Sequence, residues 1–313
     1  MIVAVTGALG NVGSAVVAGL AEAGHQVVAL DRRRTDEAAF RAAELASALA
    51  ESTGLERESI TPGAGADTIR SVDLTSYEET RSALEGADAV VHLAGIPAPV
   101  GVPDWEVHNN NVVASYNVLS AAAELGIARV VQSSSVNAIG LAWSRNPTFD
   151  YFPIDLEHGT RNEDGYSLSK LAQELQADSL TRRHEGLSVV SLRLHAVLER
   201  AGDAQAYIDR FGNGWAVHGL FGYCTFASTT GAVIRSVTAP IEGHERLWVV
   251  EPRTFLSTPS RELARRFYPG VPIGRDLEGT SSFFDASRTR DVLGWTPSTI
   301  SDPPTTLACL SEE

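Results

Sequence analysis

The chain contains a single lysine, and its spacing from a tyrosine is suited to acid–base chemistry. One Lys and 24 Arg make up its 25 basic residues, and Lys170 follows Tyr166 by four positions. On a helix these positions share a face, so the phenol and the ammonium can enter one site. At an effective dielectric near 20, a charge ~4 Å away is worth roughly 4 kcal/mol, which would bring the pKa of Tyr166 from ~10 towards neutrality. General acid–base catalysis works best when the pKa of the catalytic group lies near the working pH. The alternative is that Tyr166 and Lys170 are an exposed pair on a helix, in an Arg-rich chain that kept one Lys by chance.

A glycine-rich loop near the start of the chain has the features of a phosphate-binding turn. The segment 6–13 reads Thr-Gly-Ala-Leu-Gly-Asn-Val-Gly and follows a short apolar run. Glycines permit a tight turn and let the backbone approach a pyrophosphate at a helix N-terminus. A tight turn without a ligand is the alternative, but the strand–turn–helix context favours a dinucleotide. The expected contacts are Gly7, Gly10, Asn11, Val12 and Gly13.

Asp31 lies about 20 residues beyond this loop, at the end of the second apolar run. An acid there typically binds the ribose 2′-hydroxyl and repels a 2′-phosphate, which favours NAD. Arg32 follows at once, and because Arg can bind a 2′-phosphate, NADP stays open. A solvated strand-end carboxylate is the other interpretation of Asp31.

The elements that position these residues alternate between strand and helix along the first two thirds of the chain. This order predicts an α/β fold with a doubly wound parallel sheet, the Rossmann architecture. Residues 1–195 form the expected NAD-binding domain, with a helical insertion at about 34–70, and 196–313 form a smaller C-terminal substrate-binding lobe. The expected strands are 2–6, 25–30, one near Val72, 89–93, 129–132 and 188–194, and the first helices are 14–23, 107–125 and the one that carries Tyr166.

Composition excludes several classes of function. The net charge of −14 and pI near 5.0 argue against nucleic-acid partners or an anionic membrane surface. The two cysteines have no metal-ligand spacing, so no metal site is expected. The first strand starts at Ile2, and no apolar run is long enough to span a membrane. A cytoplasmic enzyme is the expectation.

Together these pieces resemble the extended short-chain dehydrogenase/reductase family, also called the NAD-dependent epimerase/dehydratase family. The resemblance covers nearly the whole chain. Its pieces are loose one by one but specific in this order: the loop 6–13, Asp73-Leu74, His92-Leu93-Ala94-Gly95, Asn111, Ser133-Ser134-Ser135, Tyr166 with Lys170, and Leu293-Gly294-Trp295-Thr296-Pro297.

The resemblance implies roles for these residues. Tyr166 resembles the acid–base, Lys170 the group that lowers the tyrosine pKa and binds the nicotinamide ribose, and Ser135 the serine that bonds the reacting oxygen. A turn of satisfied hydroxyls is the alternative for the serine run. The implied cofactor contacts beyond the glycine loop and Asp31 are Arg32, Asp73, Leu74, Leu93, Ala94, Gly95, Asn111, Ser133, Tyr166 and Lys170.

Departures from the family pattern bear on the substrate. Relatives that act on nucleotide sugars usually carry an Asn three residues after the Arg that ends the sixth strand, where this chain has Arg193 and Ala196. Without such donors for a diphosphate, a small carbohydrate-like substrate is favoured, as in uronate dehydrogenases. Asn137, Arg193 and His195 are candidate substrate contacts, although Arg193 has the alternative of pairing with an internal acid. For His195, His218, Trp143, Tyr207 and Trp215, core packing is favoured over a pocket.

The leading hypothesis is therefore an NAD-dependent oxidoreductase or epimerase that uses Ser135, Tyr166 and Lys170. Three alternatives stay open: a nucleotide-sugar epimerase, a non-catalytic NAD(P)-binding sensor or scaffold, and a non-redox step that uses the same tyrosine. The resemblance also implies a homodimer formed through the 107–125 helix and the Tyr166 helix.

Overall fold

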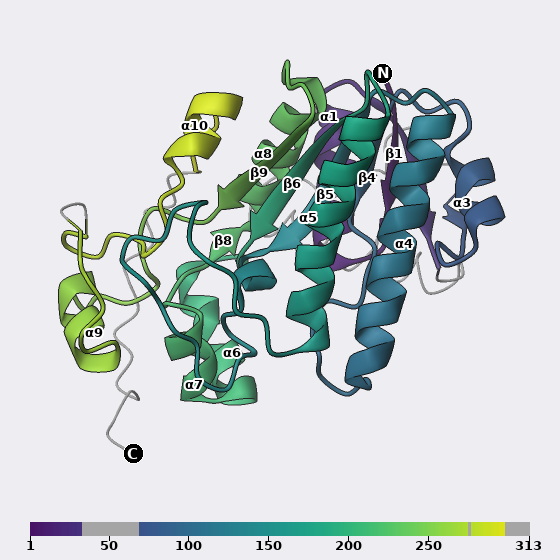
Figure 1. Cartoon of the computed structure of the whole chain (residues 1–313). Helices are drawn as coiled ribbons and strands as arrows, with labels where there is room; N and C mark the ends of the chain where they lie inside the picture. Colours follow the sequence, from purple (N-terminus) through teal and green to yellow (C-terminus); the bar gives the residue numbers. More distant parts are fainter. Residues whose placement is uncertain (33–68, 275–276, 298–313) are drawn as a thin grey trace.

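A seven-stranded parallel sheet forms the centre of the molecule (Figure 1). The computed structural model describes residues 1–32, 69–274 and 277–297. The strands run in the order β3-β2-β1-β4-β5-β6-β9, and each neighbouring pair is parallel. Their bounds are β1 Ile2–Thr6, β2 Gln26–Asp31, β3 Arg70–Ser71, β4 Ala89–His92, β5 Arg129–Ser135, β6 Ser188–Leu194 and β9 His244–Val249.

Helices cover both faces of this sheet because its strands are apolar on both sides. Successive strand residues point to opposite faces, so Val3 and Val5 join one buried core with α1 and α8, while Ala4 joins a second core with α3, α4 and α5. This arrangement confirms the predicted doubly wound Rossmann fold. The helices are α1 Asn11–Glu22, α3 Tyr77–Leu84, α4 Asp104–Glu124, α5 Gly165–Arg183, α8 Phe226–Thr238 and α10 Ser287–Leu293.

The last third of the chain contributes to the main sheet and also forms a separate group of elements. β9 pairs with β6, α8 packs on α1, and the buried Trp295 donates from Nε1 to the carbonyl of Ser228 in α8 at 2.9 Å. In Figure 1, α6, α7 and α9 lie away from α1, α3 and α4, at the end of the molecule near β8. The domain boundary at 195 stays a prediction. The added elements are β7 Val197–Leu198, α6 Ala204–Phe211, α7 Asn213–His218, β8 Cys224–Thr225 and α9 Ser260–Phe267.

Several expectations about local structure differ from the structure. The third strand, expected near Val72, is β3 at Arg70–Ser71, and the first helix, expected at 14–23, is α1 at Asn11–Glu22. The fifth strand was expected at 129–132, but β5 continues to Ser135, because the backbone of Ser133, Ser134 and Ser135 stays in register with Leu192–Leu194 of β6. The long helix starts at Asp104 rather than at Val107. The helical insertion expected at about 34–70 lies almost wholly outside the described residues. Within the described parts of the chain, no helix has the length and apolar character needed to cross a membrane.

The strand order places a crevice for ligands at a known position. From β1 the chain adds β2 and β3 on one side and then β4, β5 and β6 on the other, so the order of strand addition reverses between β1 and β4, which are parallel, hydrogen-bonded neighbours. In doubly wound sheets, ligands bind outside the carboxyl ends of the strands at this reversal. The glycine loop after β1, Leu93 after β4 and Ser135 at the end of β5 all lie at this edge.

Candidate active site

The glycine loop after β1 has no room for side chains at two of its glycines. Gly7 has φ +70°, and a Cβ there would lie 2.7 Å from the amide nitrogen of Ala94. A Cβ at Gly13 would lie 2.0 Å from the carbonyl oxygen of Gly7. Gly10 is the N-cap of α1, and no side chain of the described residues caps this helix. The first amide groups of α1 therefore suit a pyrophosphate, and the loop fits a dinucleotide.

Asp31 anchors this loop to the end of β2. The amide of Leu9 donates to Asp31 Oδ2 at 2.9 Å. Arg32, which follows, is exposed and donates from Nη1 to Asn110 Oδ1 at 3.4 Å. Hydrogen bonds from Thr75 hold the pKa of the Asp73 carboxyl below its usual value, and the charge of Arg32 adds to this effect. The structure thus brings Asp31, Arg32 and Asp73 to the same edge of the sheet.

The loop after β4 packs directly on the glycine loop. The amide of Leu93 donates to the carbonyl of Thr6 at 3.1 Å, and that of Ala94 donates to Thr6 Oγ1 at 3.3 Å. Leu74 is buried in the core, and its cofactor contact stays a prediction, like those of Leu93, Ala94 and Gly95.

The side chain of Asn111 is hydrogen-bonded to other residues of the protein. Its Oδ1 accepts from the amide of Ile96 at 2.8 Å, and its Nδ2 donates to the Ile96 carbonyl at 3.0 Å and to Ser169 Oγ at 3.3 Å. Asn111 therefore holds the loop after β4 against α4 and α5. Its predicted cofactor contact is untested, but these bonds already use both groups of the amide.

Ser135, Tyr166 and Asn137 meet at the carboxyl end of β5. Ser135 is the last residue of β5, and Tyr166 is the second residue of α5, whose N-cap is Asp164. The Tyr166 hydroxyl is hydrogen-bonded to the Ser135 side chain. Ser135 Oγ also accepts from the backbone amide of Asn137 at 3.1 Å and from its Nδ2 at 3.3 Å. Asn137 Oδ1 is buried and has no hydrogen-bond partner among the described residues.

Lys170 and Tyr166 lie on one face of α5, as their spacing predicted. The Lys170 ammonium lies 5.7 Å from the centroid of the Tyr166 ring. It donates to the carbonyl of Ser133 at 2.7 Å and to Gln173 Oε1 at 3.3 Å. Both side chains are buried, so the exposed-pair interpretation is wrong.

The predicted effect of Lys170 on the tyrosine is wrong in this structure. Burial raises the pKa of Tyr166 to about 12, because it disfavours the phenolate more than the Ser135 hydrogen bond favours it. Burial also lowers the pKa of Lys170 to about 8, against the opposing charge of Glu174. The structure therefore holds a neutral phenol beside an amine that titrates near neutral pH.

Arg193 is paired with an internal acid, while its Nη1 is buried without a hydrogen-bond partner among the described residues; its substrate contact stays a prediction. Its Nε and Nη2 donate to the two carboxylate oxygens of Glu174 at 2.9 and 2.8 Å. The guanidinium also lies 4.7 Å from the centroid of the Trp248 ring. The alternative interpretation, in which Arg193 pairs with an internal acid, is therefore correct.

His195 is a packing residue in this structure. Its Nε2 is bonded to the carbonyl of Gly219 at 2.8 Å, and its Nδ1 accepts from the amide of Ala196 at 2.7 Å. Burial lowers the pKa of His195 to about 4, so the ring is neutral. With both nitrogens engaged, the predicted substrate contact has no free donor or acceptor.

The four other candidate pocket residues belong to one aromatic region around α6 and α7. Tyr207 stacks on Trp215 with centroids 5.2 Å apart, and Trp143 meets Phe211 edge-on at 5.5 Å. His218 is half-buried, and burial lowers its pKa. For Trp215, which is 7% exposed, the core-packing interpretation is correct.

A match to a protein-family model shows to which family the chain belongs. Residues 3–203, more than half of the chain, match the model described as the NAD dependent epimerase/dehydratase family. The chain belongs to this family. The predicted family, its NAD-dependent enzyme class and the NAD cofactor named in its description are therefore confirmed.

Two curated relatives and one solved structure give the similarity in numbers. An NAD-dependent glucose-6-phosphate dehydrogenase of Haloferax volcanii is 28% identical over 61% of this chain and 67% of its own length. An L-arabinose 1-dehydrogenase (NAD(P)(+)) of the same organism is 30% identical over 61% of this chain and 65% of its own length. A short-chain dehydrogenase/reductase superfamily protein from Agrobacterium tumefaciens with bound NAD has a TM-score of 0.66 at 18% identity, covering 96% of this chain and 93% of that one. The chain thus matches about two thirds of each curated relative, and the solved structure supports the fold.

Asp31 offers a test of cofactor preference in this family member. Asp31→Asn keeps an acceptor for the Leu9 amide but removes the charge that is predicted to bind a 2′-hydroxyl and to repel a 2′-phosphate. A charged hydrogen bond is worth about 1.5–3 kcal/mol, so the Kd for NAD should rise at least about tenfold. The Kd for NADP should fall, since Arg32 remains. Calorimetric titration with both cofactors measures the ratio.

Asp88→Asn is the matched control for this experiment. Asp88 Oδ2 accepts from the amide of Ile2 at 2.6 Å, at the opposite end of β1. This variant should bind both cofactors as the wild type does. An unchanged NAD-to-NADP ratio in Asp31→Asn would contradict the role assigned to the carboxylate.

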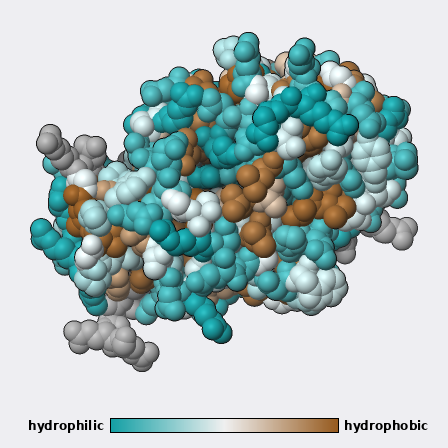
Figure 2. Space-filling view, viewed as in Figure 1, coloured by the Kyte–Doolittle hydropathy of each residue, from teal (hydrophilic) through white to brown (hydrophobic). Residues whose placement is uncertain are grey.

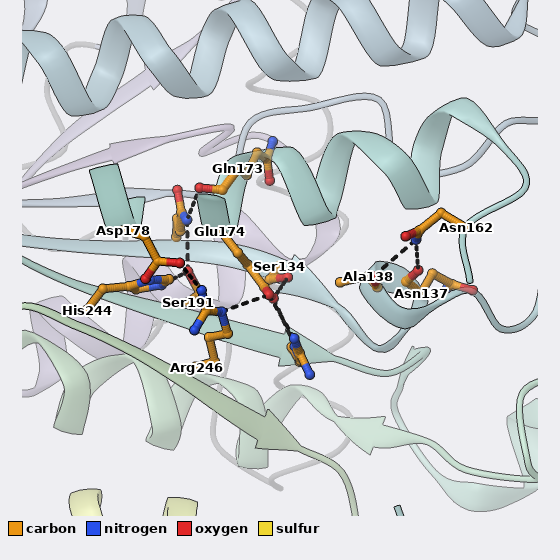
Figure 3. Close-up of polar contacts among 12 residues, drawn as sticks. Ser134, Asn137, Ala138, Asn162, Gln173, Glu174, Asp178, Ser191, His244 and Arg246 are labelled. Carbon is orange, nitrogen blue, oxygen red and sulfur yellow. Dashed lines mark hydrogen bonds and ion pairs between the residues drawn. The ribbon is translucent and has the colours of Figure 1, made fainter. Parts of the chain in front are cut away.

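Sequence reasoning missed a group of polar residues behind the site. Glu174, Asp178 and Arg246 are linked by ion pairs between α5 and β9. The spacing rule that paired Tyr166 with Lys170 also places Glu174 on that face of α5, so the signal was present. Asn162 was also missed: its Nδ2 donates to the carbonyls of Asn137 and Ala138 at 3.2 and 3.1 Å (Figure 3).

Proposed function

We propose that the protein is an NAD-dependent dehydrogenase that oxidises a hydroxyl group of a small sugar or sugar derivative. The observation that carries this proposal is the meeting of the Ser135 hydroxyl, the Tyr166 phenol and the unpaired Asn137 Oδ1 at the carboxyl end of β5. Three groups that bond to hydroxyls or carbonyls thus share one site, beside the loop that suits a dinucleotide.

Each of these side chains has a distinct role in the proposed reaction. Bound NAD would accept the hydride from the carbinol carbon. Ser135 and Tyr166 bond to the substrate oxygen. In reduction the Tyr166 phenol gives its proton to the carbonyl oxygen; in oxidation Tyr166 first releases its own proton to solvent, and its phenolate then takes the hydroxyl proton. Because the pKa of Tyr166 is raised to about 12, the phenol is the resting form, which favours its role as a donor to a carbonyl. Lys170, fixed on the Ser133 carbonyl, supplies the cation behind the phenol.

Two features of the chain support a free or phosphorylated sugar over a nucleotide sugar. Arg193 is committed to Glu174, and Ala196 replaces an amide donor, so the end of β6 offers poor recognition of a diphosphate. The unpaired Asn137 Oδ1 suits a second substrate hydroxyl. The two curated relatives are also dehydrogenases of L-arabinose and glucose 6-phosphate by name.

A substrate screen tests this proposal. The purified protein is incubated with NAD and, in turn, L-arabinose, glucose, glucose 6-phosphate, glucuronate and UDP-glucose, and NADH absorbance is followed. We expect NADH with at least one of the first four sugars and little with UDP-glucose. A methyl glycoside of the best substrate shows whether carbon 1 is the site of oxidation. Sugar turnover into an epimer without NADH, followed by NMR, would instead support an epimerase.

A patch of exposed apolar side chains on α4 and α5 supports the proposal of a homodimer. Trp105 and Tyr116 on α4 are 67% and 46% exposed, and Leu168 and Leu175 on α5 are 47% and 56% exposed. Figure 2 shows brown, hydrophobic surface over the region where Figure 1 places these two helices. We propose that a second copy of the chain covers this patch.

A further inference from the structure

A buried charged cluster lies directly behind the proposed site. We define it as Ser134, Glu174, Arg193 and Arg246, and refer to it as the Glu174 cluster. Glu174 is 0% exposed, yet it accepts from Ser134 Oγ at 2.6 Å and from Arg193 twice, and its carboxylate forms an ion pair with Arg246 Nε at 3.2 Å. Figure 3 shows Glu174 reaching from α5 towards Ser134, with Arg246 nearby. The proposed chemistry does not use any of these four residues.

The cluster joins the two elements that carry the catalytic side chains. Lys170 and Glu174 are four residues apart on the same face of α5. Lys170 bonds to the carbonyl of Ser133, and Glu174 bonds to the hydroxyl of Ser134. Two successive residues at the end of β5 are therefore tied to two successive turns of α5. Ser135 follows immediately, and its position relative to Tyr166 depends on the same two ties.

A carboxylate in this place is costly unless it is paired. Burial of an ion costs several kcal/mol, and an ion pair offsets that cost only with good geometry and further hydrogen bonds. Glu174 has both, in a two-bond contact with Arg193 and a short bond from Ser134. Such a pair contributes little net stability compared with apolar residues, so a functional reason for it is worth testing.

The charges around Lys170 identify a second effect of Glu174. His92 of β4 also lies near the ammonium, but burial above all lowers its pKa to about 3, so it is neutral. Tyr166 is a neutral phenol. Glu174 stays ionised, because Arg193 and Ser134 hold its pKa below the usual value despite burial. Glu174 is thus the anion that favours the protonated form of Lys170.

The surroundings of Glu174 itself are also charged. Arg193 of β6 and Arg246 of β9 face it. Asp178 of α5 forms an ion pair with Arg246, and its Oδ1 lies 2.8 Å from Nδ1 of His244 in β9. The two carboxylates and two guanidinium groups balance, and burial lowers the pKa of His244. Removal of the Glu174 charge therefore leaves an excess of positive charge near Lys170.

We propose that Glu174 is a positioning residue of the active site, which fixes the end of β5 through Ser134 and keeps Lys170 in its ammonium form. This inference rests on the proposed function, because it assigns a purpose to the geometry of Ser135, Tyr166 and Lys170. Glu174 does not contact the reacting atoms and acts only through these neighbours.

The single lysine of the chain gives a direct test that does not need turnover. Protein grown with lysine labelled with ¹³C at Cε has one labelled side chain, Lys170, whose NMR shift reports its titration. In Glu174→Gln the titration midpoint should fall by at least about one pH unit, because an adjacent anion favours the ammonium. Glu174→Asp restores the charge and should bring the midpoint back. A midpoint that is the same in Glu174→Gln and wild type would overturn the electrostatic part of the inference.

Activity measurements test the positioning part. Ser134→Ala removes only the link between Glu174 and β5, and should lower kcat about tenfold at unchanged KM for NAD. Ser191→Ala is the matched control, since Ser191 is a buried serine of β6 bonded to His244 and Gln132. It should lose similar thermal stability but keep kcat. Equal kcat losses in both serine variants would overturn the positioning role.

The two experiments also separate this inference from the proposed function. If wild-type protein forms no NADH with any sugar, the proposed function fails, while the Lys170 titration still decides whether Glu174 controls the ammonium. If Glu174→Gln does not fold, because it leaves Arg193 buried without its anion, the double variant Glu174→Gln with Arg193→Gln removes both charges and is titrated in its place.

Discussion

Replacement of Tyr166 by phenylalanine should lower turnover about 10²–10⁴-fold, the range that one general acid–base contributes. The phenol is hydrogen-bonded to Ser135, so its hydroxyl is placed to exchange a proton with a substrate oxygen. Removal of one oxygen leaves the ring packing intact, and NAD affinity should change little. Steady-state kinetics with the best sugar of the screen, together with calorimetric NAD binding, measure both quantities.

Tyr151→Phe is the matched control for this variant. The Tyr151 hydroxyl donates to Asp155 Oδ1 at 2.5 Å, and the contact closes a turn of the segment between β5 and α5. This variant should keep wild-type turnover. If Tyr166→Phe also keeps full turnover, another group exchanges the proton. If neither the wild type nor any variant turns over a sugar while NAD binds, the sensor or scaffold hypothesis gains support.

The sequence was sufficient to place candidate residues that are joined by short spacing. The glycine loop, Asp31 and the Tyr166–Lys170 pair each lie within one turn, one strand or one helix, and the fold brings them to the same edge of the sheet. The inner strands could also be located from the sequence, because strands that are buried on both faces form continuous apolar runs.

The sequence was insufficient where a property depends on burial or on contacts with distant segments of the chain. The pKa of Tyr166 depends on desolvation, which spacing does not report, and the expected direction was therefore wrong. The partners of His195 come in part from Gly219, which belongs to a different segment of the chain. The end of β5 was placed three residues early because serines lack the apolar pattern of a buried strand, although their backbone continues the ladder with β6.

Substitution of Gly13 by alanine should abolish measurable NAD binding. The added Cβ would lie 2.0 Å from the carbonyl oxygen of Gly7 and 2.9 Å from Ala8 Cα, and backbone cannot yield as a flexible side chain can. The loop must then move away from the first turn of α1. Loss of two charged hydrogen bonds to a pyrophosphate, each worth about 1.5–3 kcal/mol, raises the Kd at least about 100-fold. Calorimetric titration with NAD measures the change, and circular dichroism checks the fold.

Two further glycines of the chain separate loop distortion from lost ligand contacts. Gly231 lies within α8 with open space where a methyl group would be added, so Gly231→Ala should raise stability by about 0.5–1 kcal/mol and leave NAD binding unchanged. A Cβ at Gly10 would meet only the Gly7 carbonyl, at 3.3 Å, and the backbone there is extended. Gly10→Ala should therefore fold normally, and any loss of NAD affinity in it must come from the methyl group facing the ligand. If Gly10→Ala and Gly13→Ala both bind NAD as tightly as Gly231→Ala, the pyrophosphate does not lie on this loop.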